Sequence, residues 1–349
     1  MRIAVANVQV PFVHGGAEVH ADNLVRQLRA RGFETELVTI PFKWYPPERL
    51  LESIAIARML DLSEANGLRI DRLIGLKFPI YLAPHPDKVL WILHQYRSAY
   101  DLWDHPEYGD LINLPHGQAV RAAVHHADRR FIPEAKAVYA NSRNVADRLE
   151  HFNGIAARPL YHPPADAEQF HSAEARDYLF FPSRITPLKR QRLVIEALAL
   201  CREPVRVVFA GAAEVPSYMA ELQQLCREGG LEQRVVFKGF TSQAEKLALY
   251  AESLGVVYPP VDEDYGYVTL EAMLSGKPVI TTSDSGGPLE FVEHDRTGLV
   301  ATPDAANLAA QMDALWRNRS IAARMGRAGR EYYDALGISW DRVVEVLTA

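Results

Sequence analysis

The chain has 349 residues, of which 48% are hydrophobic and 23% charged, and its formal net charge is −6. This length is sufficient for two domains, and the composition is typical of a soluble globular protein. The basic residues are outnumbered and dispersed along the chain, which argues against a nucleic-acid-binding protein.

The N-terminal residues Met1–Asn7 read as a strand, without the longer apolar run and cleavage site of a signal peptide. No apolar stretch approaches the roughly 20 residues that a helix needs to cross a bilayer. We therefore expect a cytoplasmic protein, and peripheral contact with the inner face of the membrane stays open. Cys201 and Cys226 fall in predicted helices and are expected to be buried thiols rather than a disulfide or a metal pair.

Short apolar strands alternate with amphipathic helices, a pattern typical of α/β proteins with parallel sheets. Ser142 stands where a helix N-cap belongs, directly after an apolar strand. In the first half we expect strands at 2–7, 34–40, 71–76, 88–93, 136–140 and 157–161, and helices at 17–31, 47–61, 117–129 and 142–152.

Two features of this half lie beyond or at the ends of predicted strands. Gly15 and Gly16 open the first helix, but the dinucleotide fingerprint G-x-G-x-x-G is absent, so the pair is either a helix-entry turn or a loop that faces a ligand. His94 ends a predicted strand, which is where site residues are expected in such sheets. The long segment 95–116 is rich in Tyr, Trp, Asp and His, which indicates a binding loop.

The prolines at 163 and 164 interrupt the pattern, which then restarts. We expect a first domain at 1–163, a linker at 164–172, a second domain at 173–335 and a C-terminal helix at 336–349. In the second domain we expect strands at 177–182, 205–210, 234–238, 254–259, 278–281 and 298–300, and helices at 189–201, 216–228, 242–252, 266–275 and 304–318. The simplest architecture is two doubly wound, Rossmann-like α/β domains that face each other across a cleft.

A basic segment follows the first strand of the second domain. Arg184 comes directly after that strand, and Lys189 lies near the start of the next helix with Arg190 and Arg192. Cations at a helix start oppose the helix dipole, and an anionic ligand would convert that cost into binding. We predict that Arg184 and Lys189 form an unpaired cationic site, and that Arg190 and Arg192 are solvated.

The segment from Val257 to Met273 runs from an apolar strand through a proline pair and an acidic loop into a helix start. Glu263 and Glu271 bracket that loop, and Gly266 permits close approach of the backbone to a ligand. Phosphates would take the N–H groups at the helix start, and sugar hydroxyls would take the carboxylates. The arrangement fits a diphosphate that carries a sugar and a ribose.

Gly286 and Gly287 would let a backbone approach such a ligand, and Glu290 suits a first helical turn, although a simple turn explains all three residues equally well. The run Asp262-Glu263-Asp264 matches a short Asp-x-Asp metal motif. Because Arg184, Lys189 and the helix start could supply the positive charge instead, we expect no metal and no cofactor.

Together these residues resemble the retaining glycosyltransferases of family 4, which have the GT-B fold. The most specific part is the Glu-x7-Glu motif from Glu263 to Glu271, which Ser-Gly-Lys-Pro-Val-Ile at 275–280 follows as in that family. Gly15-Gly16 is similar to the family's N-terminal glycine loop, and Ala140-Asn141-Ser142 also resembles a family segment.

The resemblance implies a role for each residue. Arg184 and Lys189 would neutralise the leaving diphosphate, and Thr269 and Leu270 would donate backbone N–H groups to it. Tyr267 and Val268 would also belong to the donor-binding segment. Glu271 would hold the ribose, Glu263 the donor sugar, and His94 the sugar near the reacting carbon. The backbone near Phe240 would select the base, and Gly211 departs from the family pattern because Ala212 and Ala213 follow it.

The chain is thus predicted to transfer a sugar from a UDP-, GDP-, ADP- or dTDP-linked donor to a glycan or a lipid-linked acceptor, with retention and without a metal. The alternatives are an epimerase or hydrolase of the same fold, and a non-catalytic protein that binds sugar nucleotides.

Overall fold

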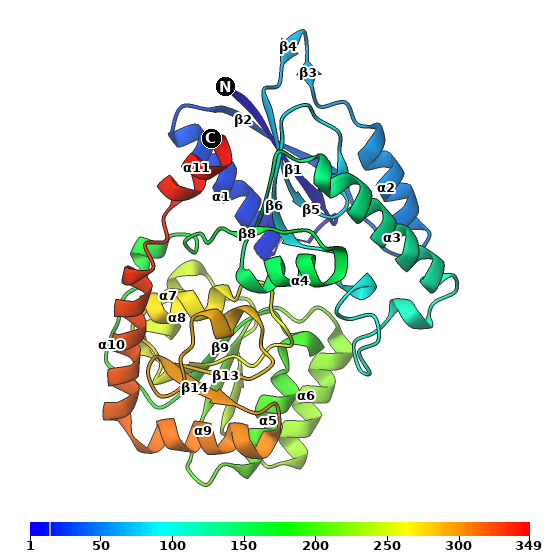
Figure 1. Cartoon of the computed structure of the whole chain (residues 1–349). Coiled ribbons are helices and arrows are strands. Elements are labelled where there is room, and N and C mark those ends of the chain that lie inside the picture. The colour runs from blue at the N-terminus through cyan, green and yellow to red at the C-terminus, as the bar shows by residue number, and fades with distance from the viewer. Residues whose placement is uncertain (14) are drawn as a thin grey trace. The chain divides into compact units, whose positions relative to one another are not determined.

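The computed structural model describes residues 1–13 and 15–349, which form two compact units. Unit 1 comprises Met1–Ala165 and Ser339–Ala349, and unit 2 comprises Asp166–Ile338. Each unit contains one six-stranded parallel sheet with helices packed on it (Figure 1). Two parallel-sheet α/β domains are therefore confirmed. The division at 165 and 166 lies close to the start of the predicted linker, and unit 2 continues to 338 rather than 335.

The unit 1 sheet has the strand order β2-β1-β5-β6-β7-β8. Its strands are β1 (Arg2–Gln9), β2 (Glu34–Pro41), β5 (Arg72–Lys77), β6 (Lys88–His94), β7 (Ala137–Ala140) and β8 (Arg158–Pro159). Its helices are α1 (Gly16–Ala30), α2 (Arg49–Met59), α3 (Gly117–Phe131), α4 (Arg143–Asn153) and α11 (Trp340–Thr348). A small antiparallel hairpin of β3 (Glu64–Ala65) and β4 (Leu68–Arg69) was not predicted.

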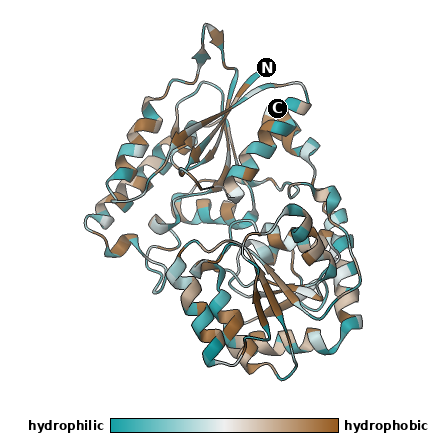
Figure 2. Cartoon of the chain, turned by 180° about the vertical axis from the view of Figure 1, so that it is seen from behind, coloured by the Kyte–Doolittle hydropathy of each residue, from teal (hydrophilic) through white to brown (hydrophobic). Residues whose placement is uncertain are grey.

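Residues of one strand alternate between two hydrophobic cores, because successive side chains of a strand point to opposite faces. In β1, Ala4 and Val8 join the core with α2, α3 and α4, whereas Ile3 and Val5 join the core with α1 and α11. Both faces of the sheet are covered, so its strands read as nearly continuous apolar runs. Figure 2 shows the same property as brown strands in both sheets.

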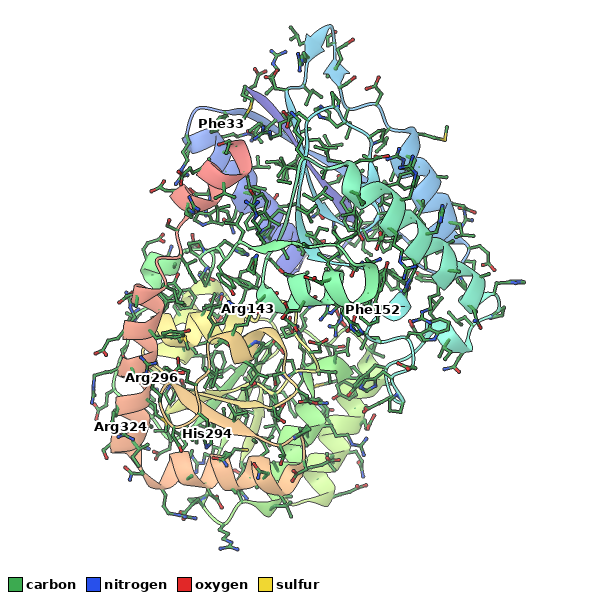
Figure 3. The ribbon with its side chains drawn as sticks, in the orientation of Figure 1. Phe33, Arg143, Phe152, His294, Arg296 and Arg324 are labelled. Carbon is green, nitrogen blue, oxygen red and sulfur yellow. The ribbon has the colours of Figure 1, made fainter. Side chains whose placement is uncertain are left out.

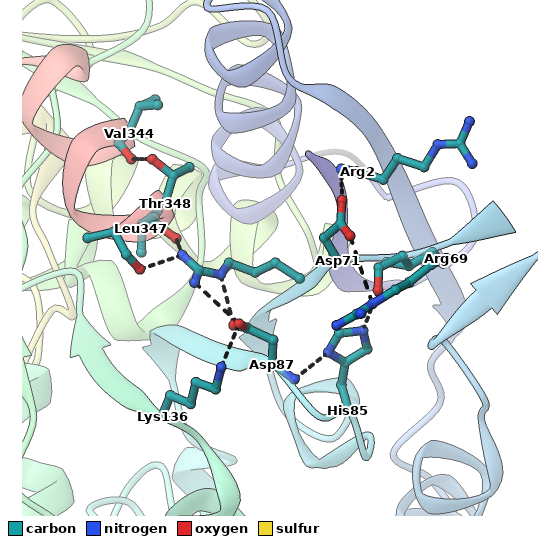
Figure 4. Close-up of polar contacts among 12 residues, drawn as sticks. Arg2, Arg69, Asp71, His85, Asp87, Lys136, Val344, Leu347 and Thr348 are labelled. Atoms are coloured by element: carbon teal, nitrogen blue, oxygen red, sulfur yellow. Dashed lines mark hydrogen bonds and ion pairs between the residues drawn. The ribbon is translucent and has the colours of Figure 1, made fainter.

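The C-terminal helix α11 belongs to unit 1 although it follows unit 2 in the chain. Val343, Val344 and Leu347 are buried in the core with α1. The Arg72 guanidinium of β5 donates to the carbonyls of Leu347 (3.0 Å) and Ala349 (2.8 Å) and also pairs with Asp87, which Lys136 contacts in turn (Figure 4). These bonds satisfy carbonyls that the end of a helix leaves without partners.

The unit 2 sheet has the order β11-β10-β9-β12-β13-β14, which is 3-2-1-4-5-6 when the strands are counted within the unit. Its strands are β9 (Leu179–Pro182), β10 (Val207–Ala210), β11 (Val235–Phe237), β12 (Gly255–Val257), β13 (Val279–Thr282) and β14 (Gly298–Ala301). Its helices are α5 (Gln191–Leu200), α6 (Pro216–Glu228), α7 (Gln243–Glu252), α8 (Tyr267–Leu274), α9 (Ala305–Arg317) and α10 (Arg319–Ala335). This is the strand order of the dinucleotide-binding Rossmann fold.

Local signals placed most helix starts correctly. The Ser142 hydroxyl accepts the Val145 N–H at 3.0 Å, which confirms the predicted N-cap of α4. The predicted helix at 216–228 has those bounds, and α5 starts two residues later than predicted because a 3₁₀ turn at Pro187–Lys189 precedes it. Both cysteines are free: Cys226 is buried in α6, whereas Cys201 is only half-buried and directly follows α5.

Candidate functional site

The strand order of unit 2 reverses between β9 and β12, which are hydrogen-bonded neighbours. Ligands of open parallel sheets bind beyond the carboxyl ends of the strands at such a point. The segment with Arg184 and Lys189 leaves β9, and the loop with Glu263 leaves β12. The topology thus brings the predicted cations and the predicted carboxylate to one place from distant parts of the chain.

Lys189 and Glu263 are in direct contact at this place. The Lys189 ammonium forms an ion pair with Glu263 and donates to the Tyr258 hydroxyl at 3.1 Å, and that hydroxyl donates to Glu263 at 3.0 Å. The Lys189 and Glu263 side chains are only 16% and 21% exposed. Burial and the neighbouring Glu263 raise the pKa of Tyr258 well above its ordinary value, while the nearby Arg184 charge opposes them, so Tyr258 stays a hydrogen-bond donor.

The prediction of an unpaired cationic site is wrong, because Lys189 pairs with Glu263 and Arg184 pairs with Glu214. The prediction that Arg190 is solvated is also wrong. Its two terminal nitrogens contact the two carboxylate oxygens of Asp284 at 2.8 and 2.7 Å, and its side chain is 16% exposed. Such a bidentate pair joins the segment after β9 to the loop after β13.

Backbone hydrogen bonds join the Glu263 loop to its neighbours. The Glu263 N–H donates to the Ser285 carbonyl at 2.8 Å, and the Gly287 N–H donates to the Glu263 carbonyl at 2.7 Å. A Cβ at Gly287 would lie 2.9 Å from the Asp264 carbonyl oxygen, so this loop pairing requires a glycine there. Gly286 bridges to Glu263 in the same pairing, and Glu290 ends the 3₁₀ turn Gly287–Glu290.

The predicted phosphate-binding helix start is α8. Gly266 is its N-cap, with φ of +78°, and a Cβ at Gly266 would lie 3.0 Å from the Pro288 ring. Tyr267, Val268, Thr269 and Leu270 form the first turn, where helix N–H groups lack partners within the helix. The Thr269 N–H nevertheless donates to the Gly266 carbonyl at 2.9 Å.

Glu271 is held from α7. Its carboxylate accepts from the Lys246 ammonium at 2.9 Å and from the Tyr250 hydroxyl at 2.7 Å, and the residue is 9% exposed. Each carboxylate oxygen can accept a further hydrogen bond.

Two predicted residues follow the neighbouring strands β10 and β11. The Gly211 N–H donates to the Gly239 carbonyl at 2.8 Å, and a Cβ at Gly211 would lie 2.0 Å from the Ser183 carbonyl oxygen. Gly211 therefore allows the loop after β10 to lie directly against the segment that carries Arg184. Phe240 follows β11, and its side chain is 86% exposed.

The other predicted residues lie at strand ends of unit 1. Gly15 is the N-cap of α1, its N–H donates to Glu18 at 2.8 Å, and Gly16 is the first residue of the helix; the adjacent His14 lies outside the described residues. His94 ends β6, and its Nδ1 contacts the Gln95 carbonyl at 2.7 Å. Asn141 follows β7, is 5% exposed, and its Oδ1 has no hydrogen-bond partner among the described residues.

The segment 95–116, which was predicted to be a binding loop, also contributes side chains to the core of unit 1. Tyr100, Leu102 and Trp103 are buried, and the Tyr100 hydroxyl donates to the buried Asp128 at 2.7 Å. Tyr100, Trp103 and Leu111 thus belong to the unit 1 core, whereas Ile112 and Leu114 are exposed, and ligand binding by this segment stays a prediction.

Several residues of the site were missed by sequence reasoning. Tyr258 is the first residue after β12 at the point of strand reversal, and this position could have indicated it. Glu214, Asp284, Lys246 and Tyr250 are contacts from other elements, and no local pattern indicates them.

The family model "Glycosyltransferase Family 4" matches residues 14–162, and the model "Glycosyl transferases group 1" matches residues 164–332. The chain belongs to the family 4 glycosyltransferases.

Among its relatives is the human alpha-1,3/1,6-mannosyltransferase ALG2, 34% identical over 155 residues that span 41% of this chain and 37% of the human protein. The D-inositol 3-phosphate glycosyltransferase of Mycobacterium marinum is 27% identical over 64% of this chain and 51% of its own length. The chain thus aligns with about half or less of these relatives. The crystal structure of Anabaena Alr3699/HepE with UDP and glucose has the same fold, with a TM-score of 0.72 and 20% identity over 100% of this chain and 99% of that one.

Within the described part of the chain, no helix is both long and apolar enough to cross a membrane. The described residues also contain no group of three His, Cys, Asp or Glu side chains placed to hold a metal ion.

Proposed function

We propose that the chain transfers a glycosyl group from a nucleoside diphosphate sugar to an acceptor hydroxyl, with retention of configuration and without a metal. One observation carries the proposal: the strand reversal in unit 2 gathers Arg184, Lys189 and Glu263 beside the start of α8. Membership of family 4 supports it.

The reaction breaks a sugar–phosphate bond through an oxocarbenium-like state while negative charge grows on the departing phosphate. Positive groups that are already in place where this charge develops are the main catalytic factor. The Lys189 ammonium has three N–H donors, of which Glu263 and Tyr258 take two. The third can bind a phosphate oxygen while Glu263 remains held, so one lysine would connect the leaving group to the carboxylate that faces the sugar.

Unlike Lys189, Arg184 would exchange its carboxylate partner for the donor's diphosphate. Its pair with Glu214 is about half exposed, and an exposed pair contributes only about 0–1 kcal/mol. A diphosphate carries more charge and more acceptor oxygens than Glu214, so the guanidinium can exchange one partner for the other at low cost. In retaining transfer, the departing phosphate would then help to deprotonate the acceptor hydroxyl on the same face of the sugar.

The donor base and the acceptor are the finer parts of the proposal. UDP is the first candidate nucleotide because a protein of the same fold has been solved with UDP, and GDP, ADP and dTDP follow. The acceptor is a glycan or a lipid-linked glycan precursor. We place the protein in the cytoplasm, with unit 1 able to touch the membrane through Trp44 and Tyr45, which are 39% and 56% exposed, and through the Lys43 ammonium next to them.

Thermal-shift measurements with UDP, GDP, ADP and dTDP test the donor site. A nucleotide at a hundredfold excess over its dissociation constant stabilises the folded protein by about 2.7 kcal/mol. Donor consumption is then measured with and without acceptors. Consumption without any acceptor identifies a hydrolase or epimerase, binding without turnover identifies a non-catalytic protein, and no shift with any of the four nucleotides contradicts the proposal.

A further inference from the structure

Unit 1 contains a cavity of about 560 Å³ between α3 and the C-terminal end of α4, a volume in the usual range for small-molecule sites. Its lining includes Arg121, His125, His126, Arg129, His151 and Phe152. Phe152 lies near the C-terminal end of α4, and Arg143 is the first residue of that helix; both are labelled in Figure 3. We call this cavity the α3–α4 pocket. Five of these six residues are arginine or histidine, and no acidic residue lines the pocket.

The two arginines of the pocket are held by backbone carbonyls rather than by carboxylates. Arg121 donates to the Ala99 carbonyl at 3.0 Å and lies 4.7 Å over the Trp103 ring, and Arg129 donates to the Phe152 carbonyl at 3.1 Å. Neither arginine forms an ion pair with any described residue. They differ in this respect from Arg184 and Arg190 of unit 2, which pair with carboxylates. The pocket therefore combines fixed guanidinium groups with uncompensated positive charge.

The charges of Arg121 and Arg129 both act on the imidazole of His125. His125 contacts the Ala99 carbonyl at 2.7 Å and stacks on Tyr100, with ring centroids 4.2 Å apart. Burial lowers the pKa of His125, and the charges of Arg121 and Arg129 lower it further against the effect of the Ala99 carbonyl. Arg121, His125 and Arg129 are spaced four residues apart on α3, so they lie on one face of the helix and line the same pocket. Concave positive surfaces of this kind concentrate anions.

The pocket is connected to the candidate catalytic histidine. Gln95 follows His94 in the chain, and its side-chain amide donates to Asp128 at 3.0 Å and to Asn153 at 2.9 Å. Asp128 precedes Arg129 on α3, and Asn153 follows Phe152 on α4. Asp128 itself is buried and does not line the pocket, and its carboxylate accepts from Tyr81, Tyr100 and Gln95 in the core. One buried hydrogen-bond network thus joins the end of β6 to the wall of the pocket.

We propose that the α3–α4 pocket binds a phosphate group carried by the acceptor. This inference rests on the proposed function, in which the donor's own phosphates are bound by unit 2. A phosphate or diphosphate offers several oxygens and more than one negative charge, which suits two arginines flanked by histidines better than a single carboxylate does. The acceptor would be either a soluble sugar phosphate or a lipid-linked diphosphate, since both present the same group.

Calorimetric titration of the full chain with inorganic pyrophosphate, in the presence of saturating UDP, tests the pocket. The double variant Arg121→Gln/Arg129→Gln should lower pyrophosphate affinity by at least about tenfold, because two charge-assisted partners are lost. Arg130→Gln is the matched control: Arg130 lies on the same helix, its guanidinium is 5.8 Å from the Phe131 ring, and it does not line the pocket. This control should change the affinity by less than about twofold.

A second variant keeps the test valid if the double variant misfolds. Gln118 lines the pocket and is exposed, so Gln118→Glu adds a negative charge without disturbing the core and should weaken pyrophosphate binding. Glucose 6-phosphate and farnesyl diphosphate then serve as probes for the soluble and the lipid-linked acceptor, and the tighter of the two identifies the source of the phosphate.

The outcomes separate the two proposals. If the wild type binds none of the four nucleotides, the proposed function fails whatever pyrophosphate does. If the wild type binds UDP, and the folded double variant and Gln118→Glu both bind pyrophosphate as tightly as the wild type, the α3–α4 pocket is not a phosphate site.

Discussion

Acidification should weaken unit 1 through two histidines in its core. His20 Nδ1 and His162 Nε2 are 3.0 Å apart, and His162 Nδ1 lies 3.1 Å from the Pro163 carbonyl. The carbonyl can only accept, so Nδ1 of His162 carries a proton and Nε2 accepts the proton of His20 Nδ1. Burial lowers the pKa of both imidazoles, so both rings are neutral near pH 7. They pack against Trp91, and His162 also packs against Trp340 of α11.

Burial lowers the pKa of His162 from 6.5 to about 3, against a smaller opposing effect of the Pro163 carbonyl. The unfolded chain therefore binds this proton first as the pH falls. The stabilisation is complete above the unfolded pKa and is lost progressively between pH 6.5 and pH 3. At roughly 1.4 kcal/mol per pH unit, His162 alone removes about 2 kcal/mol between about pH 7 and 5.

Asp128 titrates in the opposite sense over the same range. Burial raises its pKa to about 6 despite hydrogen bonds from Tyr100, Gln95 and Tyr81, so protonation of the folded form contributes roughly 1 kcal/mol of stability as the pH falls. A comparison of wild type alone at two pH values would mix the two effects. The difference between wild type and a variant at His162 separates them.

His162→Gln is that variant, because a glutamine oxygen can take the place of Nε2 as acceptor for His20 and does not titrate in this range. Urea unfolding is followed by tryptophan fluorescence at pH 7 and 5, since Trp91 lies beside His162. The variant should lose about 2 kcal/mol less stability than the wild type between those pH values. An equal loss in both proteins would refute the assignment of the neutral histidine pair.

Three further predictions concern the candidate site of unit 2. Lys189→Ala should lower kcat by about 10²-fold at saturating donor, as observed when an electrostatic donor is lost. The control is Arg192→Ala, which should keep normal turnover because Arg192 is exposed and pairs with glutamates. Steady-state kinetics measure both variants, and near-normal turnover of Lys189→Ala would exclude a catalytic role of Lys189. Gly266→Ala should lower the free energy of unfolding by about 1–2 kcal/mol, because its φ is +78° and a Cβ would meet Pro288; an unchanged melting temperature would contradict this. EDTA should leave turnover unchanged. If EDTA abolishes turnover and Mg²⁺ or Mn²⁺ restores it, the transfer requires a metal ion.

Much of the fold could be predicted because its signals are local. The Ser142 N-cap, the bounds of α6 and the positions of the strands depend on residues that are neighbours in the chain. The candidate site could be placed for a related reason. In a parallel sheet, function gathers at the strand ends, so Arg184 after β9 and His94 at the end of β6 stand out in the sequence.

What lies against each of these residues was decided by the tertiary structure. The sequence predicted free cations, but Glu214, Glu263 and Asp284 come from other loops, and only the packing of the loops at one sheet edge makes them partners. The burial of Tyr100 and Trp103, from the segment after His94, in the core of unit 1 was also not indicated by the local sequence. The α3–α4 pocket and the histidine pair likewise depend on contacts between distant segments, because charge compensation and burial are set by which surfaces meet in space.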